Sequence, residues 1–293
     1  MGHRFTYVVS PEEERENLTV EWFLRRHGYS RHIITGLKRT EDGIFRNGVR
    51  AWTSQAVHAG DVIETHLVET EPSDGILPRP VPFSVVYEDD DILVVDKPAD
   101  TPIHPSIGNY ENTLANGIAW YFEQKGEPFV YRCINRLDRD TTGLIVLAKH
   151  ALSAAVLSQA MRSREIHRTY QAFALGETAA SGTIDARLNG SLIQRTVDFA
   201  SGERSVTHYR TLAHCSVFSH LELNLETGRT HQIRVHMAYI GHPLLGDTLY
   251  NKTPGTFPRQ ALHSASLSFV HPITGEPLNF HAPLPEDMQN LLT

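Results

Sequence analysis

Residues 135–149 read NRLDRDTTGLIVLAK, a charged loop that runs directly into an apolar segment. The apolar run from Gly143 to Ala148 predicts a short buried strand. Leu137 lies inside the charged run, where it would anchor the loop to the core. Gly143 permits a close backbone approach or dihedral angles that other residues avoid. Charged residues at a strand entrance are often only a polar loop, so this stretch alone does not establish a functional site.

Apolar segments on both sides of this stretch predict the rest of a β-rich domain. Strands are expected at 92–95, 170–175 and 221–225, with a closing hairpin-like pair at 267–270 and 278–280. Helices are expected after a cap at Asn112 or Thr113 and around 233–240. Because strands dominate and do not alternate regularly with helices, we expect an α+β fold. Its large domain should hold a mainly antiparallel mixed sheet flanked by helices.

A proline-rich segment, residues 71–82, predicts a linker between two domains. Before it, residues 18–24 fit a helix that ends at Gly28, and Ser30 is a candidate N-cap for a second helix. The pair Asn47-Gly48 between apolar positions predicts a tight hairpin. We therefore expect a small α+β domain at residues 1–70 and a large domain at 83–293. Arginines and lysines in the small domain suggest an RNA-binding face, and a solvated helix surface is the alternative.

The composition is that of a globular protein, with 293 residues and a hydrophobic fraction of 40%. No apolar run approaches the length of a membrane span, and the first residues have no secretory-signal pattern. Two distant cysteines, Cys133 and Cys215, argue for a reducing compartment, so we expect a cytoplasmic protein. The net charge of −7 is unusual for a protein that binds nucleic acid. A basic groove on an acidic body would still bind it, because the distribution of charge matters more than the sum.

Several common catalytic motifs are absent from the sequence. There is no GxxxxGKS/T phosphate loop, no GxGxxG after a strand, no HExxH and no GxSxG. ATPases, dinucleotide enzymes, zinc peptidases and serine hydrolases therefore lack their usual local support.

A second informative stretch, residues 227–236, reads TGRTHQIRVH and joins a strand to a helix. Backbone N–H groups at a helix start, beside Arg229 and Arg234, form a natural anion site. A basic helix face paired with carboxylates elsewhere is the alternative. His231 and His236 have no companion cysteines or carboxylates at ligand spacing, so we expect no metal.

Residues 135–149 resemble the signature of RNA pseudouridine synthases of the RluA type, which include the ribosomal large-subunit enzymes. Three more stretches agree in the order this family uses. They are Asp96-Lys97-Pro98-Ala99, residues 227–246, and HPITGE at 271–276. The resemblance covers roughly residues 82–285. The part before the linker is similar to the S4-type RNA-binding module.

The chain departs from the family pattern at a few positions. Asn135 stands where histidine is common, Thr142 where serine is common, and Arg168 where lysine is usual. Asp100 replaces the glycine of a KPAG pattern, although glycine would adopt a turn with positive φ more cheaply. None of these changes affects Asp138.

The resemblance implies an isomerisation of uridine in RNA, either rRNA or tRNA. The C1′–N1 bond breaks, the base rotates and C5 bonds to C1′. Asp138 would supply the carboxylate, either attacking C1′ or removing a sugar proton, and Arg234 would keep it charged and aimed. Tyr170 would stack on the flipped base and assist proton transfer at C5. Residues expected to bind the substrate are Arg136, Thr142, Arg229, His231 and Gln232.

Such a reaction has no redox change, so we expect no cofactor, no nucleotide and no metal. RNA is the expected partner, with no membrane association, and we expect a monomer. Two alternatives remain open. One is a hydrolase of N-glycosidic bonds, which would release free uracil. The other is an RNA-binding protein that keeps the fold without catalysis.

Overall fold

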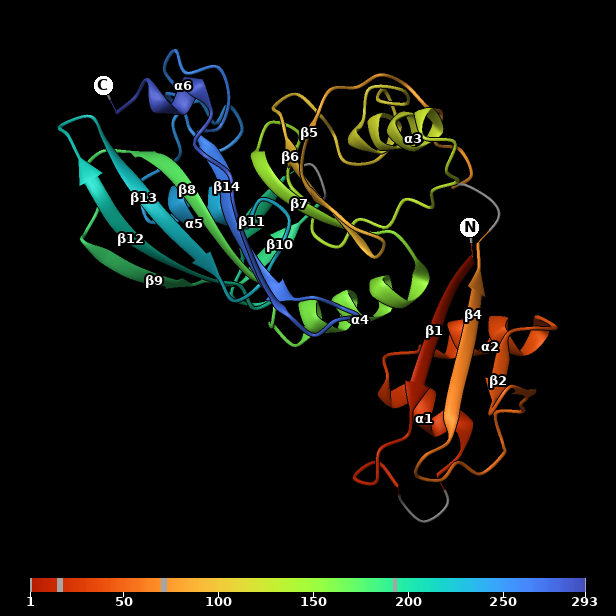
Figure 1. The fold of residues 1–293 in the computed structure, drawn as a ribbon. Helices are drawn as coiled ribbons and strands as arrows, with labels where there is room; N and C mark the ends of the chain where they lie inside the picture. The colour runs from red at the N-terminus through yellow and green to blue at the C-terminus, as the bar shows by residue number, and fades with distance from the viewer. Residues whose placement is uncertain (1, 15–17, 70–72, 192–193, 293) are drawn as a thin grey trace.

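The computed structural model describes residues 2–14, 18–69, 73–191 and 194–292. These residues form a four-stranded sheet near the N-terminus, a nine-stranded sheet and a two-stranded hairpin. Figure 1 shows the four-stranded sheet as a separate body beside the large sheet. The expected α+β fold with a large mixed sheet flanked by helices is confirmed.

The N-terminal module, residues 2–68, pairs its strands in the order β1-β4-β2-β3. Its elements are β1 (Gly2–Val8), α1 (Val20–Arg26), α2 (Arg31–Arg39), β2 (Ile44–Arg46), β3 (Val49–Arg50) and β4 (Val62–Val68). Ser30 caps α2 by accepting the Ile33 N–H, as its position predicts. Asn47 and Gly48 adopt φ of 53° and 74°, so the tight hairpin is confirmed.

The large sheet follows the order β5-β6-β7-β14-β8-β13-β12-β9, and β15 pairs with β14. Only β7 and β14 pair in parallel among the pairings of this sheet in the described residues. Its strands are β5 (Ser84–Glu88), β6 (Ile92–Lys97), β7 (Thr142–Ala148), β8 (His167–Leu175), β9 (Ser181–Asp185), β12 (Val206–His214), β13 (Phe218–Leu225), β14 (Leu262–Val270) and β15 (Pro277–His281). The expected closing pair is the antiparallel pair β14–β15.

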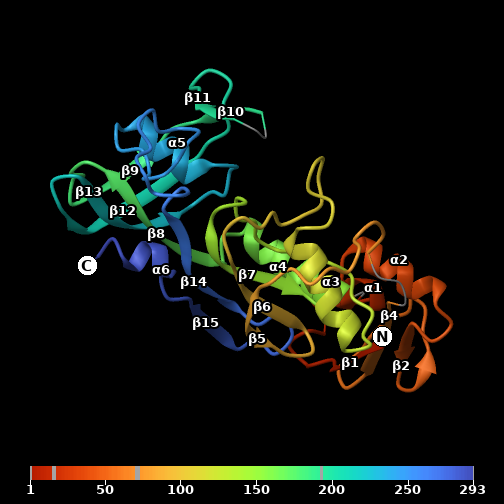
Figure 2. The same cartoon turned by 90° about the horizontal axis from the view of Figure 1, so that it is seen from above.

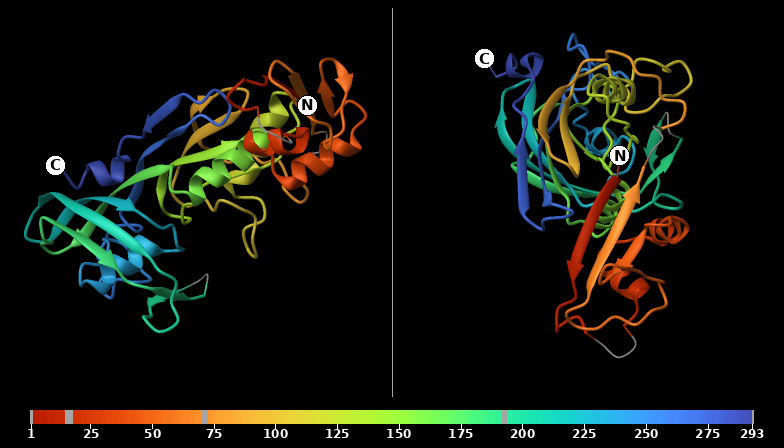
Figure 3. Two further views of the ribbon diagram at one scale, coloured as in Figure 1. Left: turned by 90° about the horizontal axis from the view of Figure 1, so that it is seen from below. Right: turned by 45° about the vertical axis from the view of Figure 1, so that its right-hand side comes forward.

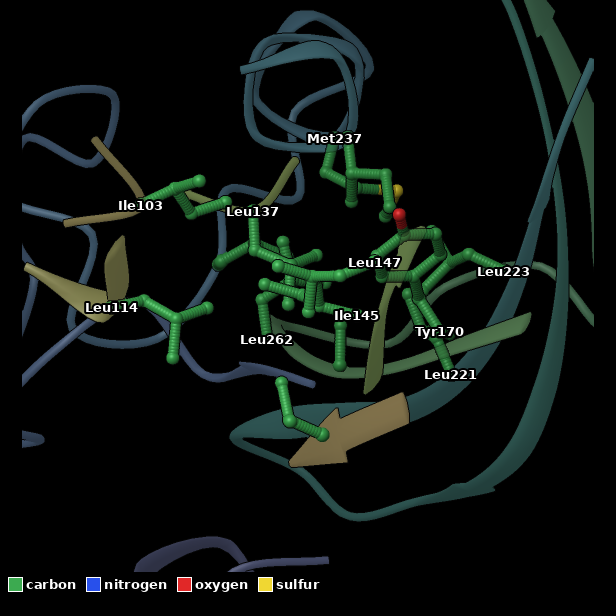
Figure 4. Close-up of a cluster of buried hydrophobic side chains, with 14 of the residues drawn as sticks. Ile103, Leu114, Leu137, Ile145, Leu147, Tyr170, Leu221, Leu223, Met237 and Leu262 are labelled. Carbon is green, nitrogen blue, oxygen red and sulfur yellow. The ribbon is translucent and has the colours of Figure 1, made fainter. Parts of the chain in front are cut away.

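Strand β7 is buried along its whole length because the sheet has a core on each face. Ile145 and Leu147 point into one apolar cluster, while Leu144 and Val146 point into another. An uninterrupted apolar run is what a strand covered on both faces requires. Leu137 belongs to the same cluster as Ile145, so the charged loop before β7 is anchored as expected (Figure 4).

Gly143 allows the charged loop to enter the sheet. Its φ is 111°, and a Cβ atom built there would lie 2.3 Å from the Ser264 carbonyl oxygen on β14. Both the positive φ and the close approach exclude other residues. The loop is therefore held against β14 at the point where its charged residues end.

Helices flank the large sheet, and one of them joins it to the N-terminal module. The helices are α3 (Leu114–Gln124), α4 (Ala151–Arg162), α5 (Gln232–Tyr239) and α6 (Glu286–Gln289). Thr113 caps α3, as one of the two expected caps. Leu152 of α4 belongs to the apolar cluster of the N-terminal module, so α4 lies between the two bodies (Figure 3).

The expected linker has an irregular structure, and part of it lies outside the described residues. Residues 70–72 are not described, and residues 73–83 contain no helix or strand. The Asn116 side chain donates to the Leu77 carbonyl at 2.8 Å, and the Arg79 N–H donates to the Asn116 carbonyl at 3.1 Å. This segment therefore follows α3 closely. The division at residues 70 and 83 stays a prediction.

Asp100 adopts the positive φ that the family pattern reserves for glycine. Its φ is 54°, and the Arg139 Nε donates to its carboxylate at 2.6 Å. Aspartate tolerates the left-handed region better than most residues, and the ion pair orients its side chain. The turn after Lys97 therefore forms without glycine.

Candidate active site

A pocket of about 790 Å³ opens where the charged loop 135–138 faces β8 and the segment 225–231. Asp138 lies on one wall and Tyr170 on β8 lies beside it. A smaller hollow continues from it toward Arg234 on α5. The two stretches singled out in the sequence therefore meet at one site, although 96 positions separate Asp138 from Arg234.

Arg234 binds two carboxylates. Its Nη1 donates to Asp138 Oδ2 at 3.1 Å, while its Nε and Nη2 donate to Asp247 at 2.8 and 2.9 Å. Burial alone would lower the pKa of Arg234, but Asp247 and Asp138 together raise it above the ordinary value. Arg234 therefore stays charged and donates to one oxygen of Asp138.

Two buried side chains, Lys97 and Arg259, donate hydrogen bonds to the backbone of the Asp138 loop. Lys97 is fully buried, and its Nζ donates to the carbonyls of Arg139 at 2.7 Å and Thr101 at 3.0 Å. Arg259 donates through Nη1 to the Asp140 carbonyl at 3.0 Å. The carbonyls of the two residues that follow Asp138 are thus fixed, which restricts where its carboxylate can point.

The pocket is basic although the chain is acidic. Among the described residues, its lining includes five arginines and two carboxylates, Asp138 and Glu226. The arginines are Arg136, Arg162, Arg164, Arg168 and Arg229. Such a lining attracts a polyanion and focuses its phosphates on the site. The net charge of the whole chain therefore gives no guide to the charge at this site.

Comparison with known proteins identifies the family. Residues 91–239 match the family model described as RNA pseudouridylate synthase. The uncharacterized RNA pseudouridine synthase YjbO of Bacillus subtilis is 38% identical over 279 residues, covering 94% of this chain and 98% of the relative. The chain belongs to the RNA pseudouridine synthase family. It is therefore an enzyme that isomerises uridine in RNA.

Further similarities agree with this assignment. Ribosomal large subunit pseudouridine synthase D of Vibrio cholerae is 42% identical over 248 residues, covering 79% of this chain and 76% of the relative. The structure of human RNA pseudouridylate synthase domain containing 1 matches with a TM-score of 0.59 at 26% identity. It covers 70% of this chain and 84% of that one. None of the helices in the described part of the chain has the length and apolar character to cross a membrane.

Tyr170 of this pseudouridine synthase is both a core residue and a pocket residue. It is 4% exposed and lies in the same apolar cluster as Leu147, Leu221 and Leu223 (Figure 4). It also lines the pocket with Asp138. Packing in the apolar cluster would hold its ring still at the border of the pocket.

The expected substrate-binding residues differ in where they lie. Arg136, Arg229 and His231 line the pocket, and Arg229 forms an ion pair with Glu203 at 2.6 Å. Gln232 is buried, where its side chain accepts the Arg229 N–H at 3.0 Å and donates to the Val206 carbonyl at 2.9 Å. It therefore shapes the turn that carries Arg229.

Thr142 is the one expected site residue that does not join the others. It is buried at the start of β7, and its hydroxyl lies 2.8 Å from His263 Nδ1 on β14. It lines neither the pocket nor the smaller hollow. A hydroxyl beside the catalytic loop is a good candidate in sequence, but the alternation of the strand turns it inward.

Lys97, Asp247 and Arg259 were missed as site residues by the sequence analysis. Lys97 was noted only within the family motif, and Asp247 follows the family stretch 227–246 directly. Their roles depend on burial and on partners far away in the chain. A charged residue next to glycine or proline carries no local sign of such a role.

One cluster outside the pocket resembles a metal site. Asp89, Asp91 and His271 bring their ligand atoms within 4.8 Å of one another. However, His271 Nδ1 accepts the N–H groups of Ile273 and Thr274, which leaves Nε2–H to donate to Asp89 Oδ2 at 3.0 Å. Because the His271 ring nitrogens are occupied by hydrogen bonds, this cluster is explained as a link between two turns.

Proposed function

We propose that this enzyme isomerises uridines of ribosomal RNA, with Asp138 as the reactive carboxylate. The named relatives support this substrate. Relatives that cover most of the chain are ribosomal large subunit pseudouridine synthases, 42% identical in Vibrio cholerae and 40% identical in Escherichia coli K12. The proposed compartment is then the cytoplasm, where such RNA is made and modified in bacteria.

The observation that carries the proposed role of Asp138 is its hydrogen bonding. Arg234 binds its Oδ2 at 3.1 Å, and within the described part of the chain its Oδ1 has no hydrogen-bond partner. The Asp138 side chain is 23% exposed and lines the pocket. One oxygen is thus held by a cation while the other is free to reach the ribose.

The other pocket groups support the same reaction. A uridine must leave its stack to reach Asp138, at a cost of a few kcal/mol. Tyr170 would stack on the flipped base, and Arg136 is exposed at the rim, where it would fill the vacated space or bind a phosphate. Arg229 and His231 line the wall next to Asp138 and would contact the nucleotide.

We also propose that residues 1–70 form an S4-like module that binds RNA next to the catalytic domain, residues 83–293. A groove between this module and α4 is lined by apolar and basic residues, and Glu165 is its one carboxylate among the described residues. The arginines of the groove are Arg4, Arg25, Arg26, Arg132 and Arg162. Arg162 also lines the active-site pocket, so the basic surface is continuous from the groove to Asp138.

The test of the reaction combines cells and purified protein. Carbodiimide-primed reverse-transcription mapping of ribosomal RNA, from cells with and without this gene, should locate the missing pseudouridine. Purified enzyme should restore it on a transcript, and Asp138→Asn should not. Asp140→Asn removes a carboxylate two positions away that does not line the pocket, and it should remain active.

The possible outcomes separate the alternatives. Free uracil among the products would indicate a hydrolase of the N-glycosidic bond. Absence of pseudouridine with both wild type and Asp138→Asn would indicate an RNA-binding protein without catalysis. Either result would overturn the proposal.

The RNA-binding role of the groove has its own test. Arg26→Glu should weaken the binding of a ribosomal RNA fragment and flatten the dependence of log K on log salt, because one phosphate contact is lost. Arg39→Glu is the control, since Arg39 lies in the same module outside the groove. If fluorescence anisotropy gives the same slope for both variants and for wild type, the groove does not bind RNA.

A further inference from the structure

Tyr250 contacts three parts of the active site, two through its hydroxyl group and one through its backbone N–H. It follows Asp247, whose carboxylate accepts the Tyr250 N–H at 3.2 Å while it binds Arg234. The Tyr250 Oη lies 2.8 Å from the backbone nitrogen of Arg195 on the β10–β11 hairpin. The same oxygen lies 2.9 Å from His231 Nδ1. Figure 2 shows this hairpin beside α5, whose N-cap is His231.

These contacts favour one direction for the hydrogen bond between Tyr250 and His231. A backbone N–H can only donate, so the Tyr250 oxygen accepts from Arg195. Among the described residues, this hydroxyl has no other partner besides His231. His231 Nδ1 is then the one acceptor for the single proton of Tyr250 among the described residues, which favours donation from Tyr250 to His231. A neutral imidazole that accepts at Nδ1 carries its own proton at Nε2.

The Nε2 of His231 faces the reactive carboxylate. It lies 3.8 Å from Asp138 Oδ2, the same oxygen that Arg234 binds. The backbone of His231 is held at φ of 56°, a left-handed conformation that costs about 1 kcal/mol outside glycine. Backbone strain of this kind is maintained where the surroundings fix a side chain for function.

We propose that Tyr250 is a positioning residue of the isomerisation, which holds His231 as the Nε2–H tautomer facing Asp138. Two N–H groups, from Arg234 and His231, then point at Oδ2, and Oδ1 stays free to react with the ribose. This proposal rests on the role of Asp138 proposed above. The orientation of the Asp138 carboxylate then depends on contacts that run from Arg195 of the hairpin through Tyr250 to His231.

The surrounding charges agree with a neutral His231. Burial, together with Arg234 and Arg195, lowers the pKa of His231, against the opposing effect of Asp138 and Asp247. Arg136 and Arg229 also line the hollow that His231 faces, and both add positive charge there. Loss of the Tyr250 hydroxyl removes a hydrogen bond that only the form unprotonated at Nδ1 can accept. The pKa of His231 should then rise.

The first test reads the tautomer directly and needs no RNA. Nitrogen-15 NMR of the full-length protein distinguishes Nδ1 from Nε2 protonation, and His231→Gln assigns the signals. Wild type should show the Nε2–H form, whereas Tyr250→Phe should show a mixture and a higher His231 pKa. Tyr239→Phe, an exposed tyrosine on α5, is the control and should match wild type. An Nδ1–H form in wild type, or no change in Tyr250→Phe, would overturn the proposal.

The second test measures the reaction on the ribosomal RNA transcript. Tyr250→Phe should lower kcat at least about tenfold with little change in KM, because substrate contacts remain while the tautomer is lost. The fall in kcat of Tyr250→Phe should become larger as the pH falls below 7, because protonation of His231 changes the charge beside Asp138. His231→Gln, which keeps an N–H donor, should retain more activity than His231→Leu.

These measurements separate failure of this proposal from failure of the proposed function. Inactive wild-type enzyme would overturn the proposed substrate and leave the NMR result standing. An active enzyme whose kcat and pH profile are unchanged in Tyr250→Phe would overturn the positioning role, whatever the tautomer.

Discussion

Arg234 makes different contacts with its two carboxylate partners, Asp247 and Asp138. Asp247 is fully buried and receives two N–H groups, whereas Asp138 is partly exposed and receives one. The bidentate contact fixes the plane of the guanidinium, and the remaining N–H then has a defined direction. A buried partner therefore sets the orientation of the group that holds the reactive one.

Replacement of Arg234 by lysine should separate charge from geometry. Lysine keeps the charge but cannot reach both carboxylates, so we expect kcat to fall on the order of 100-fold. The free energy of unfolding should fall by about 3 kcal/mol, because Asp247 loses a buried ionic partner. Single-turnover assays and urea unfolding measure the two effects. Arg210→Lys, on the exposed face of β12, should change neither. An active and stable Arg234→Lys enzyme would contradict this account.

At the scale of elements, the Asp138 loop is held by the strands on both sides of it. Lys97 is the last residue of β6, and Arg259 comes shortly before β14. Burial lowers the pKa of Lys97 to about 7, although Asp140 and Asp138 oppose this change. Three carbonyl acceptors match the three N–H bonds of the ammonium form, which favours the charged state.

Lys97→Met tests this support of the loop. Methionine fills similar space without a donor, so the carbonyls of Thr101 and Arg139 lose their buried partner. We expect the free energy of unfolding to fall by about 2 kcal/mol, and kcat to fall as the loop loosens. Urea unfolding and activity assays give the result, with Lys252→Met on the surface as the control. An unchanged unfolding midpoint would show that Lys97 does not stabilise the loop.

At the scale of the whole molecule, β1 and α4 connect the N-terminal module to the large sheet. The ring of His3 on β1 lies 4.6 Å from the ring of His150, the N-cap of α4. Gly28 of the module approaches Val156 of α4 so closely that a Cβ would lie 2.5 Å from its Cγ2. This contact holds the module against α4, and both residues line the groove between them.

The contact between the two parts should weaken in acid. Burial and the neighbouring His150 lower the pKa of His3 from 6.5 to about 4, against the effect of Asp91. Between these pH values His3 binds a proton in the unfolded chain but stays neutral in the folded protein. The stabilisation is therefore complete above pH 6.5 and is lost as the pH falls toward 4.

Thermal unfolding between pH 4 and 7.5 measures this effect. The midpoint of wild type should fall more steeply on acidification than that of His3→Phe, which keeps a ring but cannot take up the proton. His32→Gln, an exposed histidine on α2, should follow wild type. Parallel curves for wild type and His3→Phe would show that His3 does not couple the module to pH.

Local signals in the sequence were enough to predict several of the strands, turns and helix caps. The apolar run after Gly143, the Asn47-Gly48 turn and the caps at Ser30 and Thr113 each depend on neighbours within a few positions. Strands β1 and β4 were missed, because each is half exposed and their pairing joins Gly2 to Val68 across the whole module. Strand pairs so distant leave no local pattern in the chain.

The sequence by itself determined the family, the α+β class and the residues expected at the site, of which Asp138, Tyr170 and Arg234 lie together as expected. Only the tertiary structure decided which buried groups hold them. Asp247, Lys97 and Tyr250 act through hydrogen bonds whose partners come from other elements. Thr142 turns inward for the same reason. Burial and pairing depend on how distant segments meet, and a residue's type and immediate neighbours do not encode that.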